Sequence, residues 1–143
     1  MKVIDIKDLK DTEYDIPIIS RDIMEIRGVV KALYNLECSE ELINFVNSIN
    51  NQGIEYIDCK SMSYIYNNQR FAMHEMGTAE QLFIISYFAV KTNKKICILH
   101  AYRHVREDVL KIYIDWLKEN DKLDCVTLVT VNYIDSAVLK EVI

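Results

Sequence analysis

Two short apolar runs with an amphipathic stretch between them dominate the last third of the chain. Residues 96–99 are all apolar, as is typical of a strand that is covered on both faces in a parallel sheet, and residues 125–131, apolar except for Thr127 and Thr130, predict a second buried strand. Residues 106–118 place apolar side chains at helical spacing, and residues 134–142 predict a closing helix. This order of strands and helices predicts right-handed crossover units and an α/β fold with a mainly parallel sheet.

The first two thirds of the chain predict the remaining elements. We expect strands at residues 2–6, 16–19, 54–58, 63–66 and 70–74, and helices at residues 22–36, from Ser39 to about Ile49, and from Gly77 through Ala89. The pair Asn67-Asn68 predicts a turn that joins two of these strands in a small antiparallel hairpin. Since no repeat or linker divides the chain, the prediction is a single three-layer α/β domain over residues 1–143, with helices flanking the sheet.

The composition and charge of the chain disfavour several classes of protein. The chain has 50% hydrophobic residues, 27% charged residues and a net charge of −5, which favours one globular core and disfavours nucleic acid, because phosphate binding needs a basic face. The longest apolar stretch, residues 82–90, falls far short of the roughly 20 residues of a membrane helix. The four cysteines form no C-x-x-C pair and no secretory signal opens the sequence, so we expect reduced thiols, no zinc ribbon, no redox dithiol and a cytoplasmic location.

The segment from Ile18 to Leu36 is similar to the strand, phosphate loop and first helix of the ABC-type ATPases related to SMC and OLD-family proteins. In that family the loop reads G-x-x-x-x-G-K-[ST], which falls here on residues 20–27. Ser20 and Glu25 stand in place of its glycines, and Ile26 and Arg27 in place of its lysine and hydroxyl residue. A phosphate cradle needs those glycines, that charge and that hydroxyl, so the resemblance implies a degenerate Walker A loop.

The middle and end of the chain continue this resemblance. Residues 74–82 look like the family's signature motif, L-S-G-G-E/Q, with Gly77 in place of its Ser, while Glu80 and Gln81 keep the pattern. Residues 95–102 are similar to the Walker B strand, but His100 and Ala101 replace its two acids, and Asn132 replaces the histidine that senses the γ-phosphate. The resemblance implies a P-loop-NTPase-like topology in which the strand ending at Ile19 lies beside the strands ending at Leu99 and Val131.

Taken with these replacements, the resemblance implies a non-catalytic ABC-ATPase-like domain, a pseudo-ATPase that works by protein contact. For such a domain we expect no catalytic residue, no cofactor and no metal. Its partner would be a second copy of the chain, giving a homodimer, or an active ABC-type ATPase. The residues expected to contact that partner are Met76, Gly77, Thr78, Gln81, His100, Arg103 and His104.

Two alternatives stay open, and one kind of site is disfavoured. The first alternative is a small α/β enzyme or ligand-binding domain with a site at the carboxyl ends of its strands, around Ser20, His100 and Asn132. The second is a domain whose main property is homodimerisation. A metal site at His100 and His104 is disfavoured, because histidines four apart meet on one face only within a helix and His100 is expected to end a strand.

Overall fold

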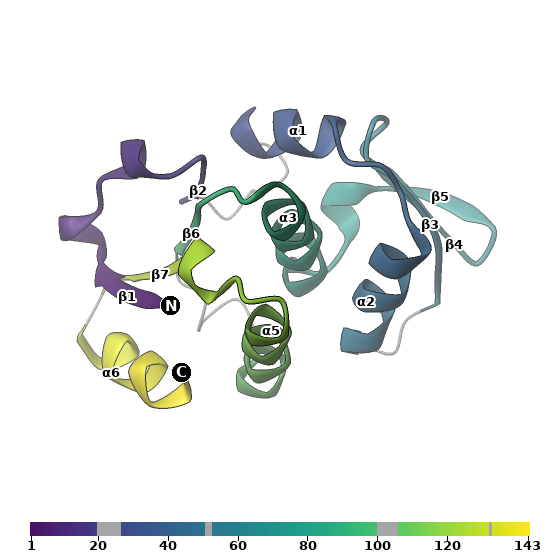
Figure 1. Ribbon diagram of the computed structural model, residues 1–143. Coiled ribbons are helices and arrows are strands. Elements are labelled where there is room, and N and C mark those ends of the chain that lie inside the picture. Colours follow the sequence, from purple (N-terminus) through teal and green to yellow (C-terminus); the bar gives the residue numbers. More distant parts are fainter. Residues whose placement is uncertain (20–26, 51–52, 100–105, 132) are drawn as a thin grey trace. The chain divides into compact units, whose positions relative to one another are not determined.

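The computed structural model of the protein describes residues 1–19, 27–50, 53–99, 106–131 and 133–143 (Figure 1). The chain groups into two compact units, and helix α3 (Thr78–Thr92) belongs partly to each. Unit 1 comprises Met1–Arg21 with Ala89–Ile143, and unit 2 comprises Asp22–Phe88. Each unit has a β-sheet of its own.

The sheet of unit 1 is parallel throughout its described strands. Its order is β1 (Lys2–Asp5), β7 (Val126–Thr130), β6 (Ile96–Leu99) and β2 (Ile16–Ile18). The side chains of β6 and β7 are almost all buried, as is predicted for strands that are covered on both faces. These two strands therefore form the centre of the unit, and the mainly parallel α/β architecture is confirmed.

Hydrogen bonds between Asp15 and Lys95 hold together the residues that precede β2 and β6. The backbone N–H groups of Asp15 and Ile16 both donate to the carbonyl oxygen of Lys95, at 2.8 and 3.1 Å. The N–H of Lys95 in turn donates to the Asp15 carboxylate at 2.8 Å. These bonds align the first residues of the two strands and set the register that pairs Ile16 with Ile96.

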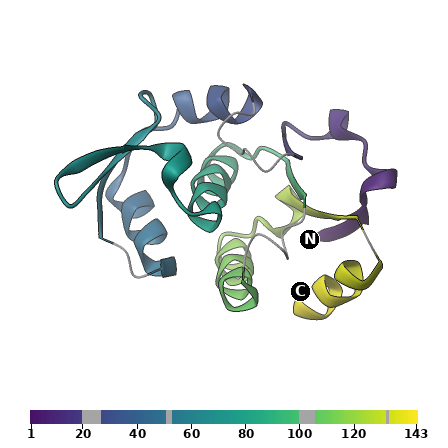
Figure 2. The same ribbon diagram turned by 180° about the vertical axis from the view of Figure 1, so that it is seen from behind.

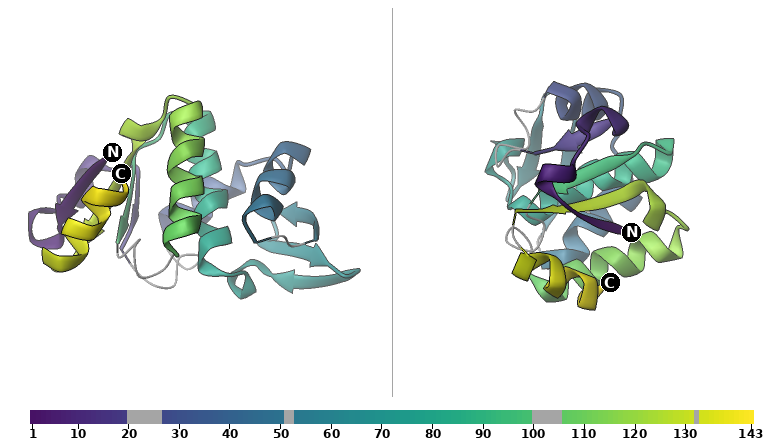
Figure 3. Two further views of the ribbon diagram at one scale, coloured as in Figure 1. Left: turned by 90° about the horizontal axis from the view of Figure 1, so that it is seen from below. Right: turned by 90° about the vertical axis from the view of Figure 1, so that its left-hand side faces the viewer.

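The helices of unit 1 follow β6 and β7. Helix α5 (Glu107–Glu119) buries the face predicted from its sequence, made of Val109, Leu110, Tyr113, Ile114 and Leu117. Helix α6 (Tyr133–Val142) packs on β1 and β7. Because the first strand and the last helix meet at this edge of the sheet, the two chain ends lie near one another (Figure 3).

Unit 2 begins with two short helices. Helix α1 (Arg27–Tyr34) stops where Asn35 and Leu36 donate backbone hydrogen bonds three residues back, to Ala32 and Leu33. Helix α2 (Glu40–Asn50) begins directly after Ser39, whose hydroxyl caps it by accepting the backbone N–H of Leu42 at 3.1 Å. Residues 22–26 of the expected first helix lie outside the described residues.

The antiparallel part of unit 2 is larger than the predicted hairpin. Strands β3 (Ile54–Asp58), β4 (Ser63–Tyr66) and β5 (Gln69–Ala72) form a three-stranded sheet, and α2 packs on β3 (Figure 2). Asn67 and Asn68 both have positive φ angles, of 51° and 61°, as the predicted tight turn between β4 and β5 requires.

The prediction that the third of these strands reaches His74 is wrong. Strand β5 ends at Ala72, and Met73–Glu75 form a 3-10 turn. The Glu75 carboxylate accepts the backbone N–H of Ala72 at 3.0 Å, which stabilises the start of this turn.

The strand adjacency implied by the family resemblance is present only in part. Strand β2 pairs with β6, as expected, but β7 lies on the far side of β6 and does not pair with β2. The expectation that β2 lies beside the strand ending at Val131 is therefore wrong, and the order of the four strands alone supports an α/β fold without specifying a P-loop family.

Candidate functional site: the Gly77 turn and a pocket beside β3

Gly77 is the cap residue of helix α3. Its carbonyl oxygen accepts the backbone N–H of Gln81 at 3.1 Å, the first bond of the helix. A Cβ atom at residue 77 would overlap the carboxylate of Glu80. Glu80 is only 2% exposed and occupies the first helical turn, where the helix dipole favours an acid. The space that Gly77 leaves is thus filled by the side chain three residues later.

Gln81 holds the chain that leads into this helix. Its side-chain amide nitrogen donates to the carbonyl oxygens of His74 and Met76, at 3.2 and 2.8 Å. Since both acceptors precede the helix, the two bonds fold residues 74–76 back onto the first turn of α3. Glu80 and Gln81, the two residues that keep the signature pattern, therefore shape the turn from inside.

The four described residues expected to contact a partner do not all reach the surface. Met76 and Gln81 are each 7% exposed, whereas Gly77 is exposed and Thr78 is half-buried. Of these four residues, only Gly77 and Thr78 reach the surface, and we call these two residues the Gly77 turn. The other three expected contact residues, His100, Arg103 and His104, lie outside the described residues.

For the alternative site at the strand ends, the structure describes the strands but not the three residues expected to form the site. Ser20, His100 and Asn132 lie outside the described residues. Strands β2, β6 and β7 precede these three residues in the sequence. Because β2 pairs in parallel with β6, and β6 with β7, the carboxyl ends of the three strands lie at one edge of the sheet. Ile19 and Val131 are exposed there.

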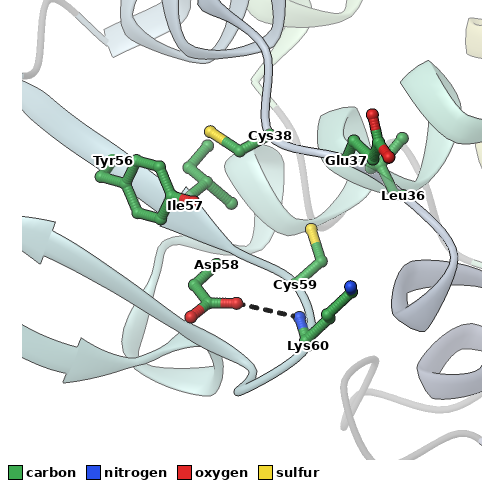
Figure 4. Close-up of a pocket in the computed structure, with 8 residues that line it drawn as sticks. All are labelled: Leu36, Glu37, Cys38, Tyr56, Ile57, Asp58, Cys59 and Lys60. Atoms are coloured by element: carbon green, nitrogen blue, oxygen red, sulfur yellow. Dashed lines mark hydrogen bonds between the residues drawn. The ribbon is translucent and has the colours of Figure 1, made fainter.

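A pocket of about 290 Å³ lies within unit 2, beside the end of β3 (Figure 4). One wall comes from the segment that connects α1 to α2, and the other comes from β3 and the residue pair that follows it. The lining residues are Leu36, Glu37, Cys38, Tyr56, Ile57, Asp58, Cys59 and Lys60.

Asp58 organises the turn at the mouth of this pocket. Its carboxylate accepts the backbone N–H groups of Lys60 and Ser61, at 3.1 and 3.3 Å. Hydrogen bonds from the side chain and then the backbone of Ser61 lower the pKa of Asp58 below its usual value of 3.8, with a smaller contribution from the guanidinium of Arg70. That guanidinium lies 3.8 Å from the carboxylate and also donates to the Ser63 hydroxyl. The carboxylate is thus occupied in holding the turn.

Two of the residues that line this pocket are cysteines. Cys38 is half-buried, Cys59 is 3% exposed, and neither is in a disulfide. Burial raises the pKa of the Cys59 thiol to about 12, with smaller contributions from the charges of Cys38 and Asp58. Cys59 is therefore a neutral thiol at physiological pH. No sequence pattern links these two cysteines, because they are far apart in the chain and only the packing of the α1–α2 connection against β3 brings them to one pocket.

Neither a metal centre nor a membrane helix is found in the described part of the chain. Within residues 1–19, 27–50, 53–99, 106–131 and 133–143, no three His, Cys, Asp or Glu side chains converge as a metal site would require. No helix in these ranges is long and apolar enough to cross a membrane.

Comparison of the chain with protein-family models finds no match, and comparison with curated proteins and with solved structures finds no significant match. The function must therefore be argued from the residues themselves.

Proposed function

We propose that this chain is a non-catalytic domain, similar in its sequence motifs to ABC-type ATPase domains, that acts by contact with another protein. In the family that the sequence resembles, two such domains face each other through their signature surfaces. The corresponding surface here is the Gly77 turn. The partner we propose is a second copy of the chain.

The observation that carries this proposal is the internal support of the Gly77 turn. The Glu80 carboxylate fills the space beside Gly77, and the Gln81 amide bonds to two carbonyl oxygens of the preceding segment. A surface turn that is held by its own buried side chains loses little conformational entropy when it binds.

The replaced motifs support the non-catalytic half of the proposal. Glu25 and Ile26 stand where a phosphate loop needs Gly and Lys, and His100 and Ala101 stand where magnesium needs acids. A loop without its glycines and lysine binds phosphate weakly, and a site without its acids holds magnesium weakly. The proposal therefore rests on these replacements and on the turn, because the position of β7 beyond β6 does not favour a P-loop topology.

The test is the variant Thr78→Arg, with Thr12→Arg as a matched control at an exposed position of unit 1. An arginine at residue 78 places a long charged side chain at the centre of the proposed contact. Sedimentation velocity over a range of concentrations should show reversible dimers for the natural sequence and for Thr12→Arg, and monomers for Thr78→Arg. A dimer that survives Thr78→Arg, or a natural protein that stays monomeric throughout, would contradict contact between copies at this turn.

A second candidate function is a ligand site at the strand ends. It is favoured by the parallel arrangement of β2, β6 and β7, because ligands of open α/β sheets bind outside the carboxyl ends of the strands. Ser20, His100 and Asn132 follow these ends in the sequence. This candidate predicts that His100→Ala abolishes ligand binding and leaves the association of the protein unchanged, whereas the contact proposal predicts that Thr78→Arg affects association first.

A further inference from the structure

Strand β5 forms one border of the antiparallel sheet of unit 2. It pairs with β4 on one side, and on its other side the described sheet has no further strand. A two-residue turn joins β4 to β5, so Gln69, the first residue of β5, forms a hydrogen-bonded pair with β4. Because the direction of the backbone groups alternates along a strand, those of Gln69 and Phe71 point toward β4, and those of Arg70 and Ala72 point away from it.

Hydrogen bonds at the end of β5 agree with this alternation. The backbone N–H of Met73 donates to the carbonyl oxygen of Met62, which directly precedes β4, at 2.8 Å. The N–H of Ala72 instead donates to the carboxylate of Glu75 at 3.0 Å. A neighbouring strand would offer a carbonyl oxygen to this N–H, so the carboxylate takes the place of that oxygen. The outer edge of β5 is thus open at the exposed Arg70 and closed at Ala72.

One face of the sheet carries a row of apolar side chains that ends at this edge. Ile57, Tyr64 and Phe71 are register partners on the three strands. Ile57 is buried, and the rings of Tyr64 and Phe71 stack with their centroids 5.5 Å apart. Phe71, the last residue of the row, is half-buried. A strand added to β5 would continue the row, and aromatic pairs across neighbouring strands stabilise a sheet.

We propose that the outer edge of β5 is a docking surface for the same edge of a second copy, and that Glu75 keeps it closed in the natural protein. Antiparallel pairing about Phe71 is two-fold symmetric, so it places Phe71 of the two copies opposite each other and Arg70 of each copy opposite Ala72 of the other. Arg70 and Ala72 then exchange two backbone hydrogen bonds, one of which needs the N–H that Glu75 holds. The pairing also brings Arg70 of one copy toward Glu75 of the other, so that opposite charges face each other.

Glu75 has an advantage over a second copy in this competition. Its carboxylate is already beside the N–H of Ala72, whereas a second copy gives up translational and rotational freedom when it binds. The natural protein therefore keeps the edge closed, and loss of the Glu75 carboxylate shifts the balance toward pairing. This contact is separate from the contact proposed for the Gly77 turn.

The first test compares Glu75→Ala with Glu55→Ala, both in the full chain carrying Thr78→Arg, which removes the proposed contact of the Gly77 turn. Glu55 is a matched control, because it is an exposed carboxylate on β3 that also accepts a backbone N–H, at 3.4 Å. Sedimentation velocity should show dimers whose share grows with concentration for Glu75→Ala and no such dimers for Glu55→Ala. Glu75→Gln should also stay monomeric, since its amide oxygen still accepts the N–H.

Disulfide cross-linking locates the contact. Phe71→Cys places a thiol at the two-fold axis, where the facing Cα atoms of an antiparallel pair lie about 4.5 Å apart, within the range that a disulfide spans. Combined with Glu75→Ala, mild oxidation should give a covalent dimer on a non-reducing gel, and with Glu75 intact it should give much less. Gln69→Cys with Glu75→Ala is the control and should not cross-link, because the symmetry places the two copies of residue 69 at opposite ends of the paired strands.

Two results would overturn the proposal. One is Glu75→Ala that associates no more than Glu55→Ala, and the other is a cross-link as strong at residue 69 as at residue 71. If Glu75→Ala does not fold, as judged by circular dichroism, hydrogen exchange of the natural protein decides. The N–H of Ala72 should exchange at least about tenfold more slowly than that of Arg70, and equal rates would show that Glu75 does not close the edge.

Failure of the Gly77 turn as a contact gives a different result. In that case Thr78→Arg alone still dimerises, or the natural protein is monomeric, and the cross-link at residue 71 remains the readout of the β5 edge.

Discussion

Asn47 and Ile54 form a closed pair of hydrogen bonds between helix α2 and strand β3. The side-chain amide nitrogen of Asn47 donates to the carbonyl oxygen of Ile54, and the backbone N–H of Ile54 donates back to the side-chain oxygen of Asn47, each at 3.0 Å. Ile54 is buried, and β3 lies at one end of the described antiparallel sheet. The asparagine thus satisfies two backbone groups that would otherwise lose their hydrogen bonds on burial.

Replacing Asn47 by alanine should destabilise the protein by about 1–3 kcal/mol, since both backbone groups of Ile54 lose their partner. Asn47→Asp keeps the acceptor and loses the donor, so its cost should be smaller. Urea unfolding followed by circular dichroism measures both. Asn44→Ala, on an exposed position of the same helix, is the control and should change stability by less than about 0.5 kcal/mol. If Asn47→Ala and Asn44→Ala change the free energy of unfolding equally, the two hydrogen bonds between Asn47 and Ile54 contribute nothing to stability.

Gly77→Ala should destabilise the protein by about 1 kcal/mol, because the added Cβ overlaps the carboxylate of Glu80, and the end of this flexible side chain must move from its buried position. Gly53→Ala is the matched control: there the Cβ would meet Tyr66 at an ordinary 4.0 Å. In the background of Glu80→Ala, the same change at Gly77 should cost much less, because the overlapping group is gone. A double-mutant cycle with no coupling would show that Glu80 does not shape the turn.

Asp58 should make stability depend on pH in the acid range. Its folded-state pKa lies below the value of 3.8 that it has when unfolded, so its stabilisation is fully present above that value and is lost as pH falls through the folded-state pKa. Asp58→Asn should therefore be less stable than the natural protein near neutral pH, and the difference should shrink below about pH 4. Asp124→Asn removes one exposed carboxylate as a control. A difference that stays constant with pH would contradict the assignment.

Several elements were predictable because local chemistry alone specifies them. Ser39 was expected to begin a helix, and its hydroxyl does accept the N–H of Leu42. The apolar sequences of β6 and β7 predicted burial on both faces of a parallel sheet, and both strands are buried. Asn67 and Asn68 tolerate the positive φ angles of a tight turn better than most residues do, so the turn was visible in the sequence.

Other features depend on tertiary contacts that no local pattern reveals. Strand β5 ends early because Glu75 reaches back to the N–H of Ala72, and a glutamate at that position is compatible with many structures. Gln81 was expected at the surface as a contact residue, but its amide turns inward to two carbonyl oxygens. Cys38 and Cys59 are brought to one pocket only by the packing of a connecting segment on β3.

Thermal unfolding of the full chain with ATP, ADP or GTP and magnesium shows whether this domain binds a nucleotide. A ligand that binds only the folded state at about 100 times its dissociation constant adds about 2.7 kcal/mol of stability, which corresponds to a rise of a few degrees. With magnesium alone as the control, a domain without a nucleotide site should show no change in its unfolding temperature at millimolar nucleotide. A rise that saturates with nucleotide concentration would contradict this expectation, and would make Arg27 the first residue to test as a phosphate ligand.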